Sequence, residues 1–312
     1  MEKQLYMYNV NFQTYEDTLW AIESRALFGR DFSEKVFFSD RAVNPSVSPF
    51  IKNRVEIHYK AKSFDELVAC VEKDESIAKD FIIKYIKLES GDPYAASRKD
   101  LCKDLGSKFK EYPNFEAPSI VFAVFTYNDQ WYFGVLKKND GLWRQHNDRP
   151  HTFSNSLKIN MAKVLINVAG QGDTNKTIVD PCCGAGTVLL EGCYAGHEMT
   201  GSDINYKMFK SAEKNLAYFG YRANLKHRPI QEIEEHFDCS IVDLPYGLYS
   251  KTSSEAQQSI IEHAKRISDR TVIVSSEDIV HMLNEVGLTI VDSCEIIKSV
   301  NRKFTRYIWI CE

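Results

Sequence analysis

The sequence predicts an α/β protein in which a mostly parallel, doubly wound sheet follows a smaller α+β region. Three observations indicate this fold. The chain of 312 residues is long enough for two domains of about 150 residues each. From about residue 177 onward, short β-branched runs alternate with segments of helical apolar spacing, which is typical of a parallel sheet. The last two extended runs are joined by a polar segment, which predicts an antiparallel hairpin at the edge of the sheet.

The second half supplies the parallel elements. The expected strands are Thr177–Asp180, Met199–Asp203, Cys239–Asp243 and Thr271–Ser275, and the expected hairpin is Leu288–Ile297 with Thr305–Cys311. The helices expected between the strands are Val188–Ala195, Met208–Phe219 and Gln257–Ile267. A further helix over Asn155–Ala169 has one apolar stripe, and Ser154 or Asn155 is its expected N-cap.

The first half mixes strands and helices. Strands are expected at Val55–Tyr59, Ile120–Thr126 and Trp131–Leu136, with a hairpin turn at Tyr127–Gln130, and helices at Phe64–Glu72 and Ser97–Phe109. The polar, proline-containing stretch 140–155 predicts the domain boundary. We therefore expect an N-terminal α+β domain over residues 1–150 and a second domain over residues 151–312.

The composition excludes several classes of protein. With 44% hydrophobic and 26% charged residues, the chain is an ordinary globular sequence, and its net charge of −4 argues against a polybasic nucleic-acid-binding protein. It has no apolar run long enough for a membrane span and no secretory signal pattern. The eight scattered cysteines lack zinc-ligand spacing, so we expect reduced thiols, no metal site and a cytoplasmic location. The oligomeric state is not predictable from these features.

The most informative segment is DPCCGAGT, which follows an expected strand ending in Asp180. Gly184 and Gly186 permit a tight turn and a close backbone approach to a ligand, and a helix begins near Thr187. The third glycine of the dinucleotide motif is absent, because Leu189 occupies its place. A carboxylate before the glycines would repel a pyrophosphate but suits a cationic ligand. Asp203 ends the next strand, where an acid can bind both ribose hydroxyls of a nucleoside.

A second segment, DLPYG, begins at Asp243 at the end of another expected strand. The Asp243 carboxylate and the Leu244 carbonyl can accept hydrogen bonds from an exocyclic amine. Pro245 stiffens the loop, and Tyr246 offers a face for stacking a base. Alone, this segment is compatible with an ordinary turn. After DPCCGAGT, it predicts methyl transfer to a base amine.

DPCCGAGT, SDIN and DLPYG together resemble the class I S-adenosylmethionine-dependent methyltransferases, which have a Rossmann-like domain with a mostly parallel seven-stranded sheet and a C-terminal antiparallel hairpin. More narrowly, they are similar to the RNA guanine-N2 methyltransferases in which an RNA-binding THUMP module precedes the catalytic domain. The resemblance covers about residues 155–312 and includes the SLKINMA helix. It implies S-adenosylmethionine as cofactor, RNA as partner, with tRNA favoured over rRNA, and a THUMP-like N-terminal domain.

The resemblance also implies the site residues. Expected cofactor contacts are Asp180, Pro181, Cys182, Gly184, Gly186, Thr187, Asp203 and Ile204, with Gln231 as a candidate for the adenine. Expected catalytic residues are Asp243, Leu244, Pro245 and Tyr246. Many relatives have proline at the position of Leu244, and an acid often follows their third strand, where this chain has Arg228 and Pro229.

Other polar residues receive structural interpretations. Cys182 follows a proline, as in cytosine-C5 methyltransferases, but in those enzymes the cysteine lies on the loop that is DLPYG here, so we expect it to fill space. Glu191 and Glu198 are expected to be solvated or capping, and His146 and His151 to lie at the surface. The segment Val135–Leu165 has six basic and two acidic side chains and contains Trp143, and Lys298–Arg306 has four basic side chains and no acid. These two segments suit RNA contact or are simply solvated loops.

Three rival functions remain open from the sequence. An adenine-N6 methyltransferase acting on RNA or DNA would use the same loop chemistry. An RNA-binding protein with a relict cofactor pocket is disfavoured by the retention of all the motif residues. A nicotinamide oxidoreductase is disfavoured by the missing glycine.

Overall fold

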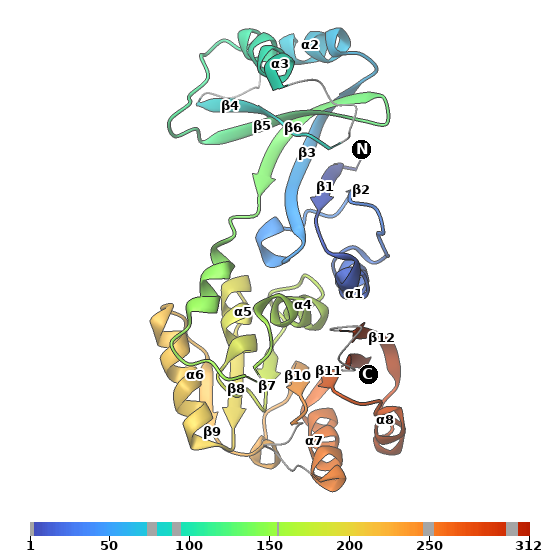
Figure 1. The fold of residues 1–312 in the computed structure, drawn as a ribbon, viewed down its shortest axis with the longest axis vertical. Coiled ribbons are helices and arrows are strands. Elements are labelled where there is room, and N and C mark those ends of the chain that lie inside the picture. Colours follow the sequence, from blue (N-terminus) through green and yellow to red (C-terminus); the bar gives the residue numbers. More distant parts are fainter. Residues whose placement is uncertain (1–2, 74–79, 89–94, 155, 246–252, 298–304) are drawn as a thin grey trace. The chain divides into compact units, whose positions relative to one another are not determined.

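The computed structural model describes residues 3–73, 80–88, 95–154, 156–245, 253–297 and 305–312. The chain forms two compact units that exchange segments along the sequence (Figure 1). Unit 1 comprises residues 1–11, 34–45 and 51–139, and unit 2 comprises residues 12–33, 46–50 and 140–312. These units are defined by internal contacts, so they do not test the functional division after residue 150, which stays a prediction.

Unit 1 is a six-stranded sheet with two helices. Its strand order is β2-β1-β3-β6-β5-β4, in which β4 and β5 are parallel and the other pairs are antiparallel. The strands are β1 (Tyr6–Val10), β2 (Val36–Ser39), β3 (Ile51–Ala61), β4 (Phe81–Tyr85), β5 (Ile120–Tyr127) and β6 (Gln130–Lys138). The helices are α2 (Phe64–Glu72) and α3 (Ala95–Ser107), and the Ser63 side chain caps α2.

The β5–β6 hairpin confirms the predicted turn. Asn128 and Asp129 both have positive φ angles, of 49° and 55°, and Tyr127 pairs with Gln130. Asparagine and aspartate tolerate this left-handed conformation better than most residues, and a turn of this hand matches the twist of the two strands. Behind the hairpin, Phe81, Phe122 and Phe133 are buried in the core of the unit.

Unit 2 is built on the predicted mostly parallel sheet. Its seven strands have the order β12-β13-β11-β10-β7-β8-β9, in which only the pairs that include β13 are antiparallel. The strands are β7 (Ile178–Asp180), β8 (Met199–Asp203), β9 (Asn224–His227), β10 (Phe237–Asp243), β11 (Ser268–Ser275), β12 (Ile290–Ile297) and β13 (Thr305–Cys311). The β12–β13 hairpin closes one edge, so the unit has the class I methyltransferase fold expected from the sequence.

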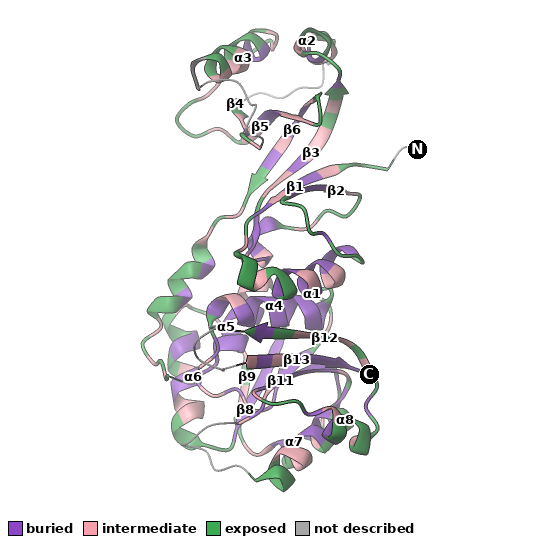
Figure 2. Ribbon diagram, turned by 45° about the vertical axis from the view of Figure 1, so that its right-hand side comes forward, coloured by how far each residue is buried: buried purple, intermediate pink, exposed green. Residues whose placement is uncertain are grey.

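Helices cover both faces of this sheet. They are α1 (Asp17–Phe28), α4 (Ile159–Gly170), α5 (Thr187–Ala195), α6 (Tyr206–Tyr218), α7 (Ser254–Ile267) and α8 (Val280–Val286). Helix α4 packs on β10 and β11 and contacts both α1 and α5, whereas α7 and α8 pack together against the other face. The central strands are accordingly buried on both sides (Figure 2). Within the described residues, every helix is too short or too polar to span a bilayer.

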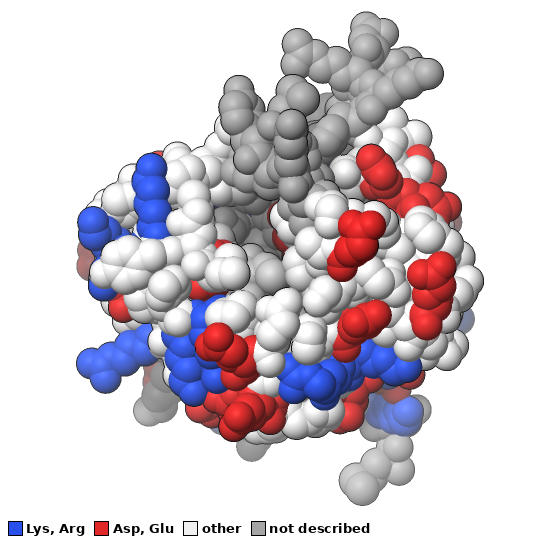
Figure 3. All heavy atoms as spheres, turned by 90° about the horizontal axis from the view of Figure 1, so that it is seen from below, with Lys and Arg blue, Asp and Glu red and all other residues white. Residues whose placement is uncertain are grey.

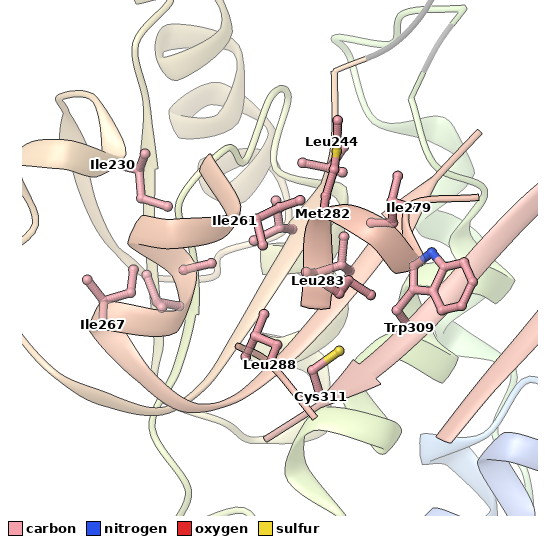
Figure 4. Close-up of a cluster of buried hydrophobic side chains, with 14 of the residues drawn as sticks. Ile230, Leu244, Ile261, Ile267, Ile279, Met282, Leu283, Leu288, Trp309 and Cys311 are labelled. Carbon is pink, nitrogen blue, oxygen red and sulfur yellow. The ribbon is translucent and has the colours of Figure 1, made fainter. Parts of the chain in front are cut away.

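The face under α7 and α8 forms a continuous apolar core. Ile261 from α7, Met282 and Leu283 from α8, and Trp309 from β13 are buried together with Leu244 (Figure 4). Because side chains alternate along a strand, Val242 and Leu244 point into this core while the residue between them, Asp243, does not. The burial of Leu244 thus anchors the start of the loop that follows β10.

Unit 2 differs from the sequence-based expectations at the start of α4 and in the helices α1 and α8, which were not predicted. Helix α4 begins at Ile159, and its N-cap is Lys158 without a side-chain hydrogen bond, so the predicted caps Ser154 and Asn155 are wrong. Helix α1 was not predicted, and it belongs to unit 2 although it lies near the N-terminus, because it packs against α4 and β12.

Candidate active site

Three acidic residues end three neighbouring strands of the unit 2 sheet. Strand β7 lies between β8 and β10, so the strand order reverses at β7, and open α/β sheets bind ligands at such a switch point beyond the carboxyl ends of the strands. Asp180 is the last residue of β7, Asp203 of β8 and Asp243 of β10. We call Asp180, Asp203 and Asp243 the carboxyl-edge acids.

Asp180 is the most deeply buried of the three. It is 4% exposed, and its Oδ1 accepts a hydrogen bond from the Cys182 N–H at 3.3 Å. Burial raises the pKa of Asp180 well above its ordinary value, and the negative charges of Asp203 and Asp243 raise it further. A bound cation would oppose both effects, so this position favours a ligand with positive charge.

The glycine loop between β7 and α5 adopts backbone angles that are typical of glycine. Gly184 and Gly186 have φ angles of 52° and 81°, which favour glycine. A Cβ on Gly186 would lie 3.0 Å from the Cβ of Ala212 in α6, so Gly186 permits close packing of the loop on that helix. A Cβ on Gly184 would meet no atom of the described residues within 4 Å, so among these residues the loop leaves room for a ligand to approach the backbone.

Asp203 joins the glycine loop to the end of β8. Its Oδ2 accepts a hydrogen bond from the Gly184 N–H at 2.8 Å, and its Oδ1 accepts one from the Asn205 N–H at 2.7 Å. A carboxylate has about four lone-pair sites, so both oxygens can still accept hydroxyl donors. The next residue, Ile204, is 72% exposed, and its carbonyl lies 3.0 Å from Nε2 of His227 at the end of β9. The exposed Ile204 side chain next to Asp203 therefore presents an apolar surface at this edge of the sheet.

The chain leaving β10 is held at two points. The Leu244 N–H donates to the carbonyl of Val274 at 2.9 Å, which extends the β10–β11 pairing beyond Asp243. The Pro245 carbonyl accepts a hydrogen bond from Nε2 of Gln257 in α7 at 3.0 Å. These two hydrogen bonds fix the backbone that follows Asp243, which is itself half-buried at the edge of the sheet. Tyr246 lies outside the described residues.

The remaining predicted cofactor contacts occupy different positions. Ser202 donates to the Pro181 carbonyl at 3.2 Å, and Thr187 is buried at the start of α5. Burial and the carboxyl-edge acids raise the pKa of the Cys182 thiol, which keeps it protonated and argues against a nucleophilic role. Gln231 is exposed on the short 3-10 helix Ile230–Glu232, where its Nε2 lies 3.4 Å from the Ser259 hydroxyl.

Two expectations about polar side chains were wrong. His146 is 1% exposed and Glu191 is 1% exposed, although we expected a surface histidine and a solvated acid. His146 Nδ1 lies 2.5 Å from Glu191 Oε1, His146 Nε2 lies 3.1 Å from the Tyr221 hydroxyl, and Lys163 Nζ lies 3.3 Å from Glu191 Oε2. We call His146, Lys163 and Glu191 the buried network. Its sequence signal was a lysine inside the apolar stretch of α4.

The burial of Lys163 also bears on the two basic segments that were expected to contact RNA. Lys163 is 2% exposed, and its Nζ lies 4.4 Å from the ring centre of Tyr194 and 5.3 Å from that of Trp143, which is itself buried. Arg306 is 3% exposed. Lys163, Trp143 and Arg306 are therefore not available for the RNA contacts expected of the basic segments. Positions 298–304 lie outside the described residues. Seen from below, basic and acidic side chains are intermixed on the surface rather than forming a field of one sign (Figure 3).

The described residues contain no group of three or more histidine, cysteine, aspartate or glutamate side chains that could hold a metal ion. All eight cysteines are free thiols.

Comparisons with known proteins agree with this geometry. Residues 146–285 match the family model described as "RMKL-like, methyltransferase domain". The chain is 22% identical over 211 residues to the tRNA (guanine(10)-N2)-dimethyltransferase of Methanothermobacter thermautotrophicus, covering 64% of this chain and 61% of that protein. It is 24% identical over 275 residues to the protein of the same name from Methanocaldococcus jannaschii, covering 80% and 73%.

Among solved structures, TrmN from Thermus thermophilus aligns over 99% of both chains with 13% identity and a TM-score of 0.47. The aligned segment spans less than two thirds of the length of the Methanothermobacter relative. The strand order, the carboxyl-edge acids and the family match all fall on the same part of the chain. Residues 146–285 are thus similar to an RMKL-like methyltransferase domain in sequence, and they contain the three carboxyl-edge acids.

Proposed function

We propose that this chain transfers a methyl group from S-adenosylmethionine to the exocyclic amine of a base in RNA, with guanine N2 in tRNA as the target, in the cytoplasm. The observation that supports this most is the meeting of the three carboxyl-edge acids at the switch point of the sheet. Asp180 and Asp203 flank the glycine loop, and Asp243 begins the DLPYG loop.

The residues at this edge fit S-adenosylmethionine. The open space at Gly184 allows a ligand to approach the loop, and the acidic surroundings of Asp180 suit its ammonium and sulfonium charges. Asp203 is placed to accept hydrogen bonds from ribose hydroxyls, with Ile204 beside it for the adenine. When bound, this cofactor supplies an activated methyl group.

The acceptor amine is assigned to Asp243 and Leu244. The Asp243 carboxylate and the Leu244 carbonyl accept hydrogen bonds from the two amine hydrogens, which orients the nitrogen lone pair. Asp243 also takes the proton that the amine loses. Tyr246 stacks on the base, which must leave its helical stack to reach this loop. Most of the rate then comes from positioning the amine.

The target is inferred from the relatives. Relatives from Methanothermobacter thermautotrophicus, Methanocaldococcus jannaschii and Pyrococcus abyssi are named as tRNA (guanine(10)-N2)-dimethyltransferases. The chain is also 38% identical over 84 residues to a protein named ribosomal RNA large subunit methyltransferase K/L from Colwellia psychrerythraea, covering 26% of this chain. The longer matches favour tRNA over rRNA. We assign RNA binding to unit 1, as a THUMP-like module, and treat adenine N6 as the alternative target because DLPYG serves either amine.

The test compares Asp243→Asn with Asp238→Asn, which changes an exposed acid at the opposite end of the same strand. Purified protein is incubated with labelled cofactor and, in separate reactions, with unmodified tRNA, rRNA or DNA, and the product nucleosides are identified. We expect N2-methylguanosine in tRNA. Asp243→Asn should lower kcat by about 10²–10⁴-fold, the range for loss of a positioned general base, and Asp238→Asn should leave it unchanged.

Undiminished methylation by Asp243→Asn would refute the catalytic role of that residue. N6-methyladenosine as the product would replace the guanine assignment, and methylation of rRNA alone would replace tRNA as the substrate. Failure of the wild-type protein to bind the cofactor in calorimetry would refute the proposed activity altogether.

A further inference from the structure

Asn215 connects two segments that the proposed site needs in fixed positions. It lies in the second half of α6, outside the sequence motifs, and is 0% exposed. Its Nδ2 donates to the carbonyl of Ala185 in the glycine loop at 2.9 Å and to the carbonyl of His151 at 2.9 Å. Its Oδ1 accepts a hydrogen bond from the His151 N–H at 2.9 Å.

This arrangement uses three of the four hydrogen-bonding positions of the amide. The pair of bonds to the two backbone groups of His151 fixes that residue in both distance and orientation, as a strand partner would. The third bond passes to Ala185, which lies between the two glycines of the loop. One side chain therefore joins the polar segment that precedes α4 to the backbone that faces the ligand.

The same helix supports the glycine loop at a second point. Gly186 packs against Ala212, one turn before Asn215 in α6, at a separation that would leave only 3.0 Å to an added Cβ. Asp203, just before α6, accepts the Gly184 N–H. Gly184, Ala185 and Gly186 are thus each held from the β8–α6 segment, but Asn215 is the contact that also holds the segment at His151.

We propose that Asn215 is a positioning residue for the cofactor loop. It does not touch the cofactor. It holds the Ala185 peptide, and with it the orientation of the Gly184 and Gly186 backbone, against the segment at His151. This inference rests on the proposed function, because its consequence is measured as affinity for S-adenosylmethionine.

The test uses Asn215→Asp, which keeps the shape of the side chain and an acceptor for His151 but cannot donate to both carbonyls. The matched control is Asn167→Asp. Asn167 is also a buried helical asparagine of unit 2, 5% exposed, and its Nδ2 donates to the Val47 carbonyl at 3.0 Å and to the Glu23 carboxylate at 2.6 Å. Both variants lose donated hydrogen bonds in a buried place, but only one of them loses a bond to the cofactor loop.

Calorimetry with S-adenosylmethionine and with its demethylated product gives the dissociation constants, and thermal unfolding gives the stability of each variant. We expect Asn215→Asp to raise Kd about tenfold for both ligands, corresponding to about 1.4 kcal/mol, and Asn167→Asp to leave Kd within about twofold of the wild type. The KM for the cofactor should rise with Kd in Asn215→Asp, while kcat at saturating cofactor stays within about threefold.

An unchanged Kd in folded Asn215→Asp would overturn the role of Asn215 while leaving the proposed function intact, provided that the wild type binds. A wild type that does not bind would overturn the proposed function instead. If Asn215→Asp does not fold, Asn215→Ser replaces it, since serine is small enough for the site and too short to bridge both segments. Equal increases of Kd in the Asn215 and Asn167 variants would reduce the effect to general destabilisation and also overturn the inference.

Discussion

Unit 2 contains buried acids at two sites with opposite electrostatic surroundings: Glu191 in the buried network and the carboxyl-edge acids. In the buried network, the two oxygens of Glu191 face a lysine and a histidine, and Lys163 is further enclosed by the rings of Trp143 and Tyr194. At the carboxyl edge, the charges that act on Asp180 are those of two more acids, and they raise its pKa in the same direction as burial does.

This difference separates structure from function. A buried acid that meets cations and donors within the protein is compensated, and removing one partner leaves a costly charge behind. Acids that lie close together repel one another, and a cationic ligand would relieve that repulsion. Perturbed pKa values at such sites are an indication of function. The buried network therefore holds the helices together, whereas the carboxyl-edge acids are the groups that we propose to bind the cofactor and the acceptor amine.

The largest expected effect is on the buried network. Lys163→Met removes its lysine and should lower the free energy of unfolding by about 3–5 kcal/mol, because Glu191 stays buried without that partner. Urea denaturation measures this change. The double variant Lys163→Met/Glu191→Gln removes the stranded charge and should recover more than half of the loss. Equal stability of the single variant and the wild type would contradict the structural role.

Glu23 provides a pH test of a buried acid whose hydrogen-bond donors are neutral. It is fully buried on α1, where its carboxylate accepts hydrogen bonds from Ser48 and Asn167 at 2.6 Å each, and burial raises its pKa to about 7. A folded-state pKa above the ordinary value means that stability is complete below about pH 4.5 and falls as the pH rises to about 7, by up to about 3 kcal/mol.

Glu23→Gln should remove that part of the pH dependence and raise the stability at pH 8, because the amide oxygen still accepts from Asn167, the amide NH2 can donate to the Ser48 hydroxyl, and no charge is buried. Thermal unfolding from pH 4.5 to pH 8 gives the two profiles. Parallel profiles for wild type and variant would show that Glu23 does not titrate in this range.

At the carboxyl edge, the same kind of change should affect binding rather than folding. Asp180→Asn is expected to weaken binding of S-adenosylmethionine by about 10–100-fold, or about 1.4–2.7 kcal/mol, without lowering stability, since it removes a buried like charge. The wild-type affinity should increase with pH, because a cationic ligand favours the ionised carboxyl and its binding releases a proton. Calorimetry in buffers of different ionisation enthalpy measures that proton. If Asp180→Asn bound S-adenosylmethionine as tightly as the wild type does, the proposed difference between the carboxyl-edge acids and the buried network would be wrong.

The smallest expected effect concerns RNA. Lys137 and Lys138 are exposed at the end of β6 and belong to the basic segment expected to contact phosphates. Lys137→Glu/Lys138→Glu should weaken tRNA binding about threefold to tenfold and flatten its salt dependence, leaving cofactor binding intact. The control Lys99→Glu/Lys103→Glu alters two exposed lysines of α3 in the same unit. If both double variants lost the same amount of tRNA affinity, the effect would not be specific to Lys137 and Lys138, and the RNA contact expected of this basic segment would be contradicted.

Much of the unit 2 fold was predictable because its signals are local. Strand β8 and strand β13 have the predicted bounds, and the β12–β13 hairpin closes the edge as expected. A β-branched run that ends in an acid and a glycine turn is recognisable within a few residues of sequence. The same locality explains why the glycine loop could be identified before any tertiary contact was known.

The errors came from residues whose environment is set by distant segments. His146 and Glu191 are 45 residues apart and become partners only when α4 and α5 pack beside the 3-10 helix Leu142–Asp148. From sequence alone, a charged side chain is expected to be solvated, because most charged side chains in proteins are exposed. The assignment of α1 to unit 2 depends in the same way on its packing against α4 and β12.

The sequence by itself determined the alternation of elements, the glycine turn and the identity of the acids at the strand ends, since each depends on backbone preferences within a short window. Only the tertiary structure decided which acids are compensated. Charge compensation depends on which side chains meet across the fold, so it separates Glu191, which faces Lys163, from Asp180, which faces two further carboxylates.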